Sequence, residues 1–103
     1  MSFLASKVAL VTGGSGTIGQ AIAKGLLQQG AAVCLVGRRV EALEKAQQHL
    51  SSYGSVSYVS CDISNEESVV DLYMTMDEQY GRIDLLINND YFFSMSFDSI
   101  CSW

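Results

Sequence analysis

Positive charge is scarce in this sequence. Its 103 residues contain six lysines and arginines against eleven aspartates and glutamates, for a formal net charge of −5. This balance argues against nucleic acid or an anionic membrane as a partner. There is also no signal-peptide pattern and no apolar run long enough to cross a bilayer. We therefore expect one small globular domain.

Cysteine is the next residue type in short supply. Cys34, Cys61 and Cys101 are odd in number and show no Cys-x-x-Cys spacing. This pattern indicates neither a disulfide framework nor a zinc site. A reduced, cytoplasmic setting is the expectation that follows. Proline is absent altogether.

What the sequence does contain is an alternation of strand and helix patterns. Short apolar runs predict four strands, at 8–11, 32–36, 56–61 and 83–89. Helical periodicity lies in each interval between them. Parallel strands joined by right-handed crossovers follow from this order. The predicted fold class is α/β, a Rossmann-like doubly wound parallel sheet, incomplete, with about four strands and three helices.

The predicted helices have their own apolar stripes and boundary signals. The first begins at Thr17, and its stripe is expected at Ile18, Ile22 and Leu26. The second carries Val40, Leu43, Ala46 and Leu50. The third is expected to open with a Ser64-x-x-Glu67 capping box, to carry Val69, Val70, Tyr73 and Met76, and to end before Gly81.

The first turn of the predicted sheet is rich in glycine. Gly14, Gly16 and Gly19 form G-x-G-x-x-G directly between a strand and a helix. In that context glycines allow a tight turn, close approach of a pyrophosphate and close packing of the helix on the sheet. The helix N-terminus adds unpaired N–H groups for the phosphates. The alternative is a glycine-rich turn without a ligand.

The end of the second predicted strand bears on the choice of dinucleotide. An NAD site usually places a carboxylate about 20 residues after the loop, to accept from the ribose 2′-hydroxyl. Here the strand ends in Arg38 and Arg39 instead. Guanidinium groups pair well with a 2′-phosphate, so NADP(H) is favoured over NAD(H). The alternative is a solvated arginine pair at the start of a helix.

Four stretches together carry a resemblance to a known family: VALVTGGSGTIG, LVGRR, VSCDIS and GRIDLLINN. Over Lys7 to Asn89 the chain resembles the N-terminal half of a short-chain dehydrogenase/reductase. The resemblance implies an NAD(P)-dependent oxidoreductase. It also implies that the glycine loop cradles the cofactor with the backbone at Gly13, Ser15, Gly16, Thr17, Ile18 and Gly19.

Further positions match the family's cofactor contacts. Arg38 matches the contact to the 2′-phosphate, and Asp62 and Ile63 match the pair that flanks the adenine. Asn89, with Asn88 beside it, matches the asparagine against the adenosine ribose. The structural alternatives are that Asp62 orders the turn at Ser64, and that the two asparagines are ordinary residues at the end of a strand.

The sequence departs from the family pattern in two places. The usual loop, T-G-x-x-x-G-x-G, has a glycine where this chain has Thr17, although Thr12, Gly13, Gly16 and Gly19 meet the spacing of the extended branch. The N-N-A-G motif reads Asn88-Asn89-Asp90-Tyr91, and the match is not resumed. We therefore divide the chain into a predicted NADP-binding half-domain, 1–89, and an atypical aromatic tail, 90–103.

The family's catalytic serine and Tyr-x-x-x-Lys pair have no counterpart in these 103 residues. None of the five tyrosines has a lysine four residues later. The chain alone is therefore predicted to be inactive. Three interpretations stay open: the cofactor-binding portion of an oxidoreductase, a non-catalytic cofactor-binding or interaction fragment, and a truncated product without a selected function. An exposed fourth strand and the tail are expected to favour association with a full-length relative or with itself.

Overall fold

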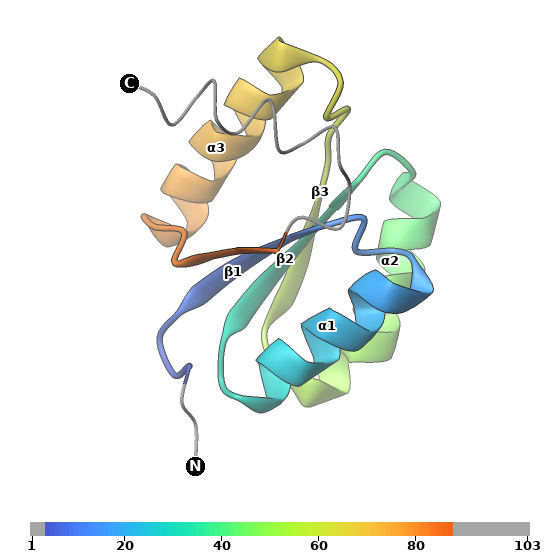
Figure 1. Ribbon diagram of the computed structural model, residues 1–103, viewed down its shortest axis with the longest axis vertical. Coiled ribbons are helices and arrows are strands. Elements are labelled where there is room, and N and C mark those ends of the chain that lie inside the picture. The colour runs from blue at the N-terminus through green and yellow to red at the C-terminus, as the bar shows by residue number, and fades with distance from the viewer. Residues whose placement is uncertain (1–3, 88–103) are drawn as a thin grey trace.

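The computed structural model of the chain describes residues 4–87. Their order is β1 (Val8–Thr12), α1 (Thr17–Gln28), β2 (Ala32–Gly37), α2 (Val40–Leu50), a 3₁₀ turn (Ser51–Tyr53), β3 (Val56–Ser60), α3 (Glu66–Tyr80) and β4 (Leu85–Ile87). The strands form one parallel sheet in the order β3-β2-β1-β4 (Figure 1). The predicted Rossmann-like α/β fold is confirmed.

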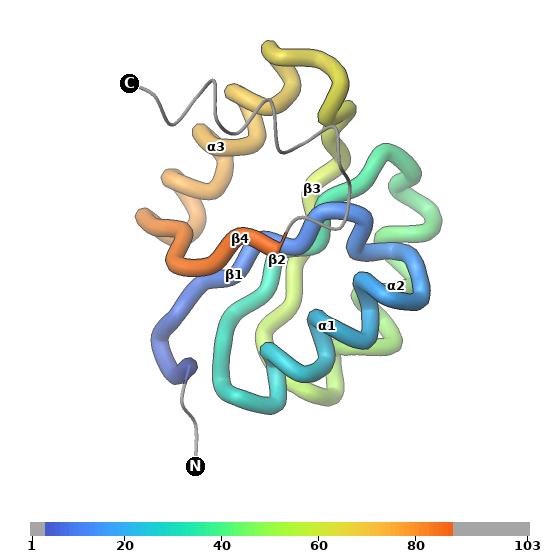
Figure 2. Tube along the Cα trace, in the orientation of Figure 1, coloured from blue at the N-terminus to red at the C-terminus, as the bar shows by residue number. Residues whose placement is uncertain are grey.

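The sheet lies between two helical layers. Helices α1 and α2 cover one face, and α3 covers the other (Figures 1 and 2). Residues alternate between the two faces along each strand. In β1, Val8 and Leu10 pack in the core beneath α3, whereas Ala9 and Val11 pack in the core beneath α1 and α2. Because both faces are covered, β1 is buried at all five positions.

The predicted apolar stripe of α1 was wrong by one position. The residues of α1 that are buried are Gly19, Ala23 and Leu27, whereas Ile18 is 66% exposed. The reason is the glycine loop, because Gly19 must lie against the backbone of that loop. Because of this contact, the buried face of α1 begins one residue later than the apolar pattern of the sequence predicts.

The start and the stripe of α3 also differ from expectation. Its N-cap is Asn65, whose side chain accepts the Ser68 N–H at 3.1 Å, and not Ser64. Ser64 instead donates to the Asp62 carboxylate. Leu72 is buried with Val69 and Met76, whereas Val70 is 42% exposed. The predicted end of the helix is confirmed, because Gly81 caps it with φ of 72°.

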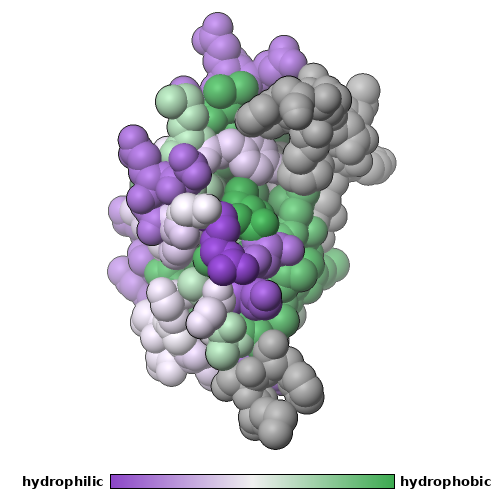
Figure 3. All heavy atoms as spheres, turned by 90° about the vertical axis from the view of Figure 1, so that its left-hand side faces the viewer, coloured by the Kyte–Doolittle hydropathy of each residue, from purple (hydrophilic) through white to green (hydrophobic). Residues whose placement is uncertain are grey.

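Strand β4 lies at the edge of the sheet that residues 4–87 form. Among the described strands it pairs with β1 alone, and all three of its residues are half-buried. Figure 3 views the side of the molecule formed by α3 and the segment that leads into β4, and apolar side chains are visible there among hydrophilic ones. The predicted edge position is thus present in the described part of the chain.

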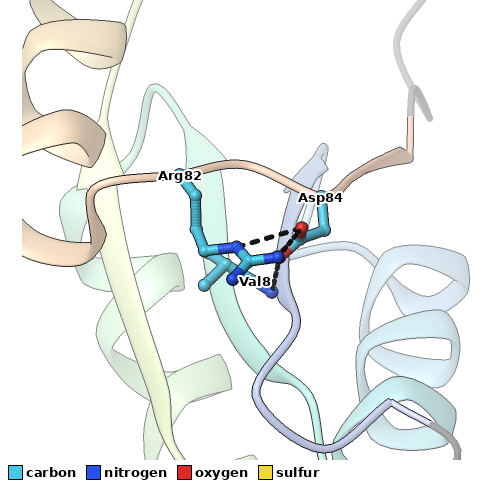
Figure 4. A network of polar contacts seen from close by, with 3 residues as sticks. All are labelled: Val8, Arg82 and Asp84. Atoms are coloured by element: carbon cyan, nitrogen blue, oxygen red, sulfur yellow. Dashed lines mark hydrogen bonds and ion pairs between the residues drawn. The ribbon is translucent and has the colours of Figure 1, made fainter.

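A polar network fixes the entry to β4 (Figure 4). Asp84 Oδ2 accepts the Val8 N–H at 2.8 Å, and the Asp84 N–H donates to the Val8 carbonyl at 2.8 Å. Arg82 donates to Asp84 Oδ1 from Nε at 3.0 Å and from Nη2 at 2.6 Å. The Arg82 guanidinium, and then the Val8 N–H, hold the pKa of Asp84 below its ordinary value. The network therefore aligns β4 with the beginning of β1.

No helix within residues 4–87 is both long enough and apolar enough to span a membrane.

Candidate functional site

The candidate site lies where the carboxyl ends of β1, β2 and β3 meet. In open parallel sheets this edge is where ligands bind. A hollow of about 200 Å³ opens there. Its lining comes from the end of β2 and from the turns that follow the three strands: Gly13, Ser15, Val36, Gly37, Arg38, Arg39, Cys61 and Ile63. The fold thus brings six of the residues proposed from sequence, Gly13, Ser15, Arg38, Arg39, Ile63 and the adjoining Asp62, to one edge of the sheet.

Glycine is needed for steric reasons in the β1–α1 turn. Gly13 has φ of 64°, a left-handed conformation that residues with a side chain rarely adopt. A Cβ at Gly19 would lie 2.2 Å from the Gly13 carbonyl oxygen. The first turn of α1 can therefore pack against the loop only because position 19 has no side chain. The Gly14 N–H donates to the Val36 carbonyl at 3.3 Å and fastens the loop to β2.

The N-terminus of α1 has a polar end that no side chain of the helix satisfies. Its N-cap, Gly16, offers no side-chain hydrogen bond, and the first turn contains no acidic residue. The first N–H groups of a helix lack partners within the helix and carry partial positive charge. Thr17 and Ile18 are exposed in this turn. The Gln20 amide donates to the Ser15 carbonyl at 2.9 Å and braces the loop from below.

Positive charge lies at the next strand end. Arg38 and Arg39 follow β2, both are exposed, and Arg39 is the N-cap of α2. Ser60 Oγ donates to the Arg38 carbonyl at 3.3 Å, which ties this backbone to β3. The positions that follow β2 bear no carboxylate until Glu41 in the first turn of α2. Two guanidinium groups therefore border the hollow without a carboxylate on the same strand end.

The turn after β3 is shaped by Asp62. Its Oδ1 accepts the Ser64 hydroxyl at 2.6 Å and the Ser64 N–H at 3.0 Å. These two bonds, and more weakly the charge of Arg38, hold the pKa of Asp62 below its ordinary value. The structural alternative for Asp62, ordering this turn, is therefore realised, and the carboxylate remains exposed beside the hollow. Ile63 is buried, with 8% of its surface exposed. Asn88 and Asn89 lie outside the described residues.

Two residues that the sequence did not single out complete this turn. Asn65 caps α3, and the Ser68 hydroxyl accepts the Asp62 N–H at 3.0 Å. An Asn three residues before a Ser is a weak signal, because it matches many unrelated turns. The hydrogen bond between Ser68 and Asp62, six positions apart, has no sequence signature. Within residues 4–87 there is no cluster of side chains that could hold a metal ion.

The arrangement fits a phosphorylated dinucleotide. Glycine lets the loop and the start of α1 pack closely together, and the first turn of α1 offers N–H groups without competing carboxylates. The hollow beside it has apolar walls from Val36, Cys61 and Ile63 and guanidinium groups at its rim. An anion, a flat apolar ring and a second anion would each find matching chemistry there.

Comparison with known proteins identifies a family and several relatives to which the chain is similar. The family model described as short chain dehydrogenase matches residues 7–90. A Pseudomonas aeruginosa protein named rhamnolipids biosynthesis 3-oxoacyl-[acyl-carrier-protein] reductase is 43% identical over 86 residues, which is 84% of this chain and 34% of that protein. The Bacillus subtilis protein named uncharacterized oxidoreductase YvrD is 38% identical over 92 residues, 89% of this chain and 35% of its own length.

Solved structures with the same fold include complexes with either dinucleotide. The Pseudomonas aeruginosa RhlG/NADP complex superposes with a TM-score of 0.79 at 43% identity, covering 84% of this chain and 35% of that one. An NAD⁺-bound xylitol dehydrogenase gives 0.79 at 35% identity, covering 82% and 33%. The L-sorbose reductase of Gluconobacter frateurii with NADPH and L-sorbose gives 0.81 at 34% identity, covering 87% and 35%. The chain thus spans about a third of the length of these relatives.

Proposed function

The chain belongs to the short chain dehydrogenase family, and on that premise we propose that residues 1–89 form a dinucleotide-binding half-domain that prefers NADP(H) to NAD(H). The observation that carries the proposal is the shared hollow. Gly13 and Ser15 of the glycine loop and the two arginines after β2 line one space, although they are separated in sequence. Helix α1 begins directly after this loop, and its N-cap makes no side-chain hydrogen bond.

The proposed contacts divide along this space. Backbone groups at Gly13, Ser15, Gly16 and the first turn of α1, Thr17 to Gly19, hold the pyrophosphate. Arg38, with Arg39 beside it, pairs with the ribose 2′-phosphate. Asp62 and Ile63 border the adenine, and Asn88 and Asn89 border the ribose. The relatives named above support dinucleotide binding as such, because their complexes contain NADP, NADPH or NAD⁺.

The preference for NADP(H) is testable at Arg38. Charge-assisted hydrogen bonds contribute about 1.5–3 kcal/mol each, so Arg38→Ala is expected to raise the Kd for NADPH about 10- to 100-fold. The Kd for NADH should change less than about twofold, because NADH has no 2′-phosphate for the guanidinium to bind. Fluorescence titration of both cofactors measures this.

The matched control is Lys24→Ala. Lys24 lies over the Tyr53 ring, 4.8 Å from its centroid, and does not line the hollow. Its loss removes the same net charge as the loss of Arg38. If Lys24→Ala weakened NADPH as much as Arg38→Ala, a diffuse field rather than the arginine would set the preference, and this part of the proposal would be wrong.

We further propose that these 103 residues bind the cofactor without turning it over. The nicotinamide supplies hydride transfer when it is bound, but the Tyr-x-x-x-Lys pair expected to move the proton is absent from the sequence. Incubation of the purified chain with NADPH and a panel of ketones should give no cofactor oxidation above buffer. Turnover that scales with the concentration of the chain would contradict this. The cytoplasmic setting expected from the cysteines belongs to the same proposal.

A second candidate function is association through β4. The half-buried residues of this strand and its position at the edge of the described sheet favour it, since an edge strand offers unpaired backbone groups to another chain. The proposed partner is a full-length relative or a second copy. Analytical ultracentrifugation and co-purification with such a relative would test it, and a chain that stays monomeric in both experiments would exclude it.

A further inference from the structure

Ser68 connects the first turn of α3 to the two residues that follow β3. Its hydroxyl accepts the Asp62 N–H at 3.0 Å and lies 3.4 Å from Cys61 Sγ, to which it donates. The Cys61 thiol in turn lies 3.5 Å from the Ser68 carbonyl. Asp62 and Cys61, which follow β3, are therefore held by one side chain six and seven positions later.

These bonds are separate from the cap of α3. The cap is made by the Ser68 N–H, which donates to Asn65 Oδ1 at 3.1 Å. The hydroxyl is not needed for it. Its bonds run backwards to Cys61 and Asp62, so their effect is on where the end of β3 lies and not on whether α3 begins.

The segment that Ser68 holds forms one wall of the hollow. Cys61 and Ile63 line it, and both are buried, with 2% and 8% of their surfaces exposed. The Cys61 N–H donates to the Gly37 carbonyl at 2.8 Å, which fixes the segment to β2 on its other side. Asp62, between them, directs its carboxylate to Ser64. From the side of α3, the Asp62 carbonyl accepts the Asn65 N–H at 3.0 Å, and the Ser68 hydroxyl is the side-chain contact that holds the Asp62 N–H.

We propose that Ser68 is a positioning residue for the adenosine end of the site. It touches no part of a ligand itself. It acts by holding the Cys61–Ile63 backbone at the distance from Arg38 that a base and its ribose 2′-phosphate require. This inference rests on the proposed function and adds a residue that neither the glycine loop nor the arginines identify.

The test uses two ligands that separate the ends of the site. Adenosine 2′,5′-bisphosphate contains the adenosine end and one phosphate of the pyrophosphate, whereas inorganic pyrophosphate needs only the glycine loop and the start of α1. Ser68→Ala removes the hydroxyl but keeps a residue that favours helix. The loss of one hydrogen bond that holds the wall is expected to weaken the bisphosphate and NADPH by the same factor, about tenfold. Pyrophosphate binding, followed by NMR, should be unchanged.

Two further variants distinguish positioning from general destabilisation. Ser68→Thr retains the hydroxyl and should bind the bisphosphate within about twofold of the unmutated chain. Ser51→Ala removes a hydroxyl that donates to the Gln48 carbonyl at 3.0 Å, at an exposed place outside the hollow, and should bind as the unmutated chain does. Amide hydrogen exchange at Asp62 should accelerate in Ser68→Ala alone, because its N–H loses its acceptor.

The outcomes separate this inference from the proposed function. Equal binding of the bisphosphate by Ser68→Ala and the unmutated chain would overturn the role of Ser68 and leave the proposed function intact. Equal losses of pyrophosphate and bisphosphate would overturn it as well, since the effect would then not be confined to the adenosine end. If the unmutated chain bound neither NADPH nor the bisphosphate, the proposed function would be wrong and the role of Ser68 would fall with it.

Discussion

The turns that lead into α1 and α3 differ in how they provide partners for the first N–H groups of the helix. Each takes the chain from the end of a parallel strand into a helix whose first N–H groups need partners. At α3 the protein supplies them, since Asn65 caps the helix and Glu66 and Glu67 place negative charge in its first turn. At α1 it supplies none of this, because Gly16 has no side chain to cap with and the turn has no acidic residue.

The difference identifies which helix end is prepared for an outside anion. A capped and negatively charged terminus, as in α3, has its polar groups satisfied and repels phosphate. A helix with glycine at the N-cap is less stable than one capped by Asn, Asp or Ser, although only by about a few tenths of a kcal/mol. The chain accepts that cost at α1 in a turn where Gly13 adopts a left-handed conformation and Gly19 packs directly against the loop backbone. This combination is difficult to explain by folding alone and is what a phosphate-binding turn requires.

The largest effect is expected when a methyl group is added at Gly19, in the first turn of α1. Gly19→Ala places a Cβ 2.2 Å from the Gly13 carbonyl oxygen, so the loop or the helix must move. We expect the free energy of unfolding to fall by about 3 kcal/mol and NADPH binding to weaken more than about tenfold, which denaturant titration and fluorescence would measure.

Gly25→Ala is the matched control for this change. Gly25 lies in the same helix, and a Cβ there would meet nothing within 4 Å. Alanine should stabilise the helix by about 0.5–1 kcal/mol without altering NADPH affinity. Two glycine substitutions in α1 with similar effects would contradict the account of Gly19.

The next largest effect is expected from giving α1 the negative charge that α3 has. Thr17→Asp places a carboxylate in the exposed first turn, where the helix dipole favours it by about 0.3–1 kcal/mol. The same charge would repel a pyrophosphate, so the Kd for NADPH should rise about tenfold or more. Stability and affinity should thus change in opposite directions. Thr17→Asn, which is neutral and of similar size to Asp, should leave affinity close to that of the unmutated chain.

A smaller effect is expected from removing the cap of α3. Asn65→Ala leaves the Ser68 N–H without its acceptor and should lower the free energy of unfolding by about 1 kcal/mol. Asn65→Asp, which keeps an acceptor, should retain most of the stability. NADPH affinity should fall far less than in Thr17→Asp. A loss of affinity as large as in that variant would mean that the two helix ends are not functionally different.

The smallest effect is expected at the beginning of β1, at the end of the sheet opposite the hollow. There Asp84 contacts Arg82 and the Val8 N–H. The pKa of Asp84 is lowered in the folded chain, so its contribution to stability is present above the ordinary pKa of about 4. The contribution is lost as the pH falls through the lower, folded-state value. Asp84→Asn should melt at a slightly lower temperature at pH 7, and this difference should shrink and then vanish as the pH falls through the lowered, folded-state pKa of Asp84.

A control for this pH dependence is cofactor affinity. Asp84 pairs with the beginning of β1, whereas the hollow lies at the carboxyl ends of the strands. Asp84→Asn should therefore leave NADPH binding at pH 7 unchanged. A difference in melting temperature that persisted undiminished at low pH would show that the ionised carboxylate is not the stabilising form.

The sequence was sufficient for the parts of this fold that depend on local pattern. A buried strand such as Val8–Thr12 is predicted by its nearly continuous run of apolar residues. Gly81 predicts the end of α3 because glycine readily adopts the left-handed conformation of a helix C-cap. The glycine loop was predicted from the spacing of its glycines between a strand and a helix. The arginines were predicted from their place directly after the second strand. Their meeting in one hollow follows from the topology.

The parts that were missed depend on contacts between distant atoms. The buried face of α1 is set by where Gly19 touches Gly13, and hydrophobicity favoured Ile18 instead. Ser64 and Asn65 are both good caps in sequence, and the choice between them was decided by Asp62, which engages Ser64. The bond from Ser68 to Asp62 appears only once the strand and helix are in place.

The measurement that tests the central claim most directly is a thermal melt of the unmutated chain, alone and with NADPH or NADH at equal concentration. A ligand at about one hundred times its Kd adds about 2.7 kcal/mol to the folded state, which raises the midpoint of a chain of this size by about ten degrees or more. The account predicts a cooperative transition that NADPH raises further than NADH does. A transition that neither cofactor shifts, or that both shift equally, would contradict it.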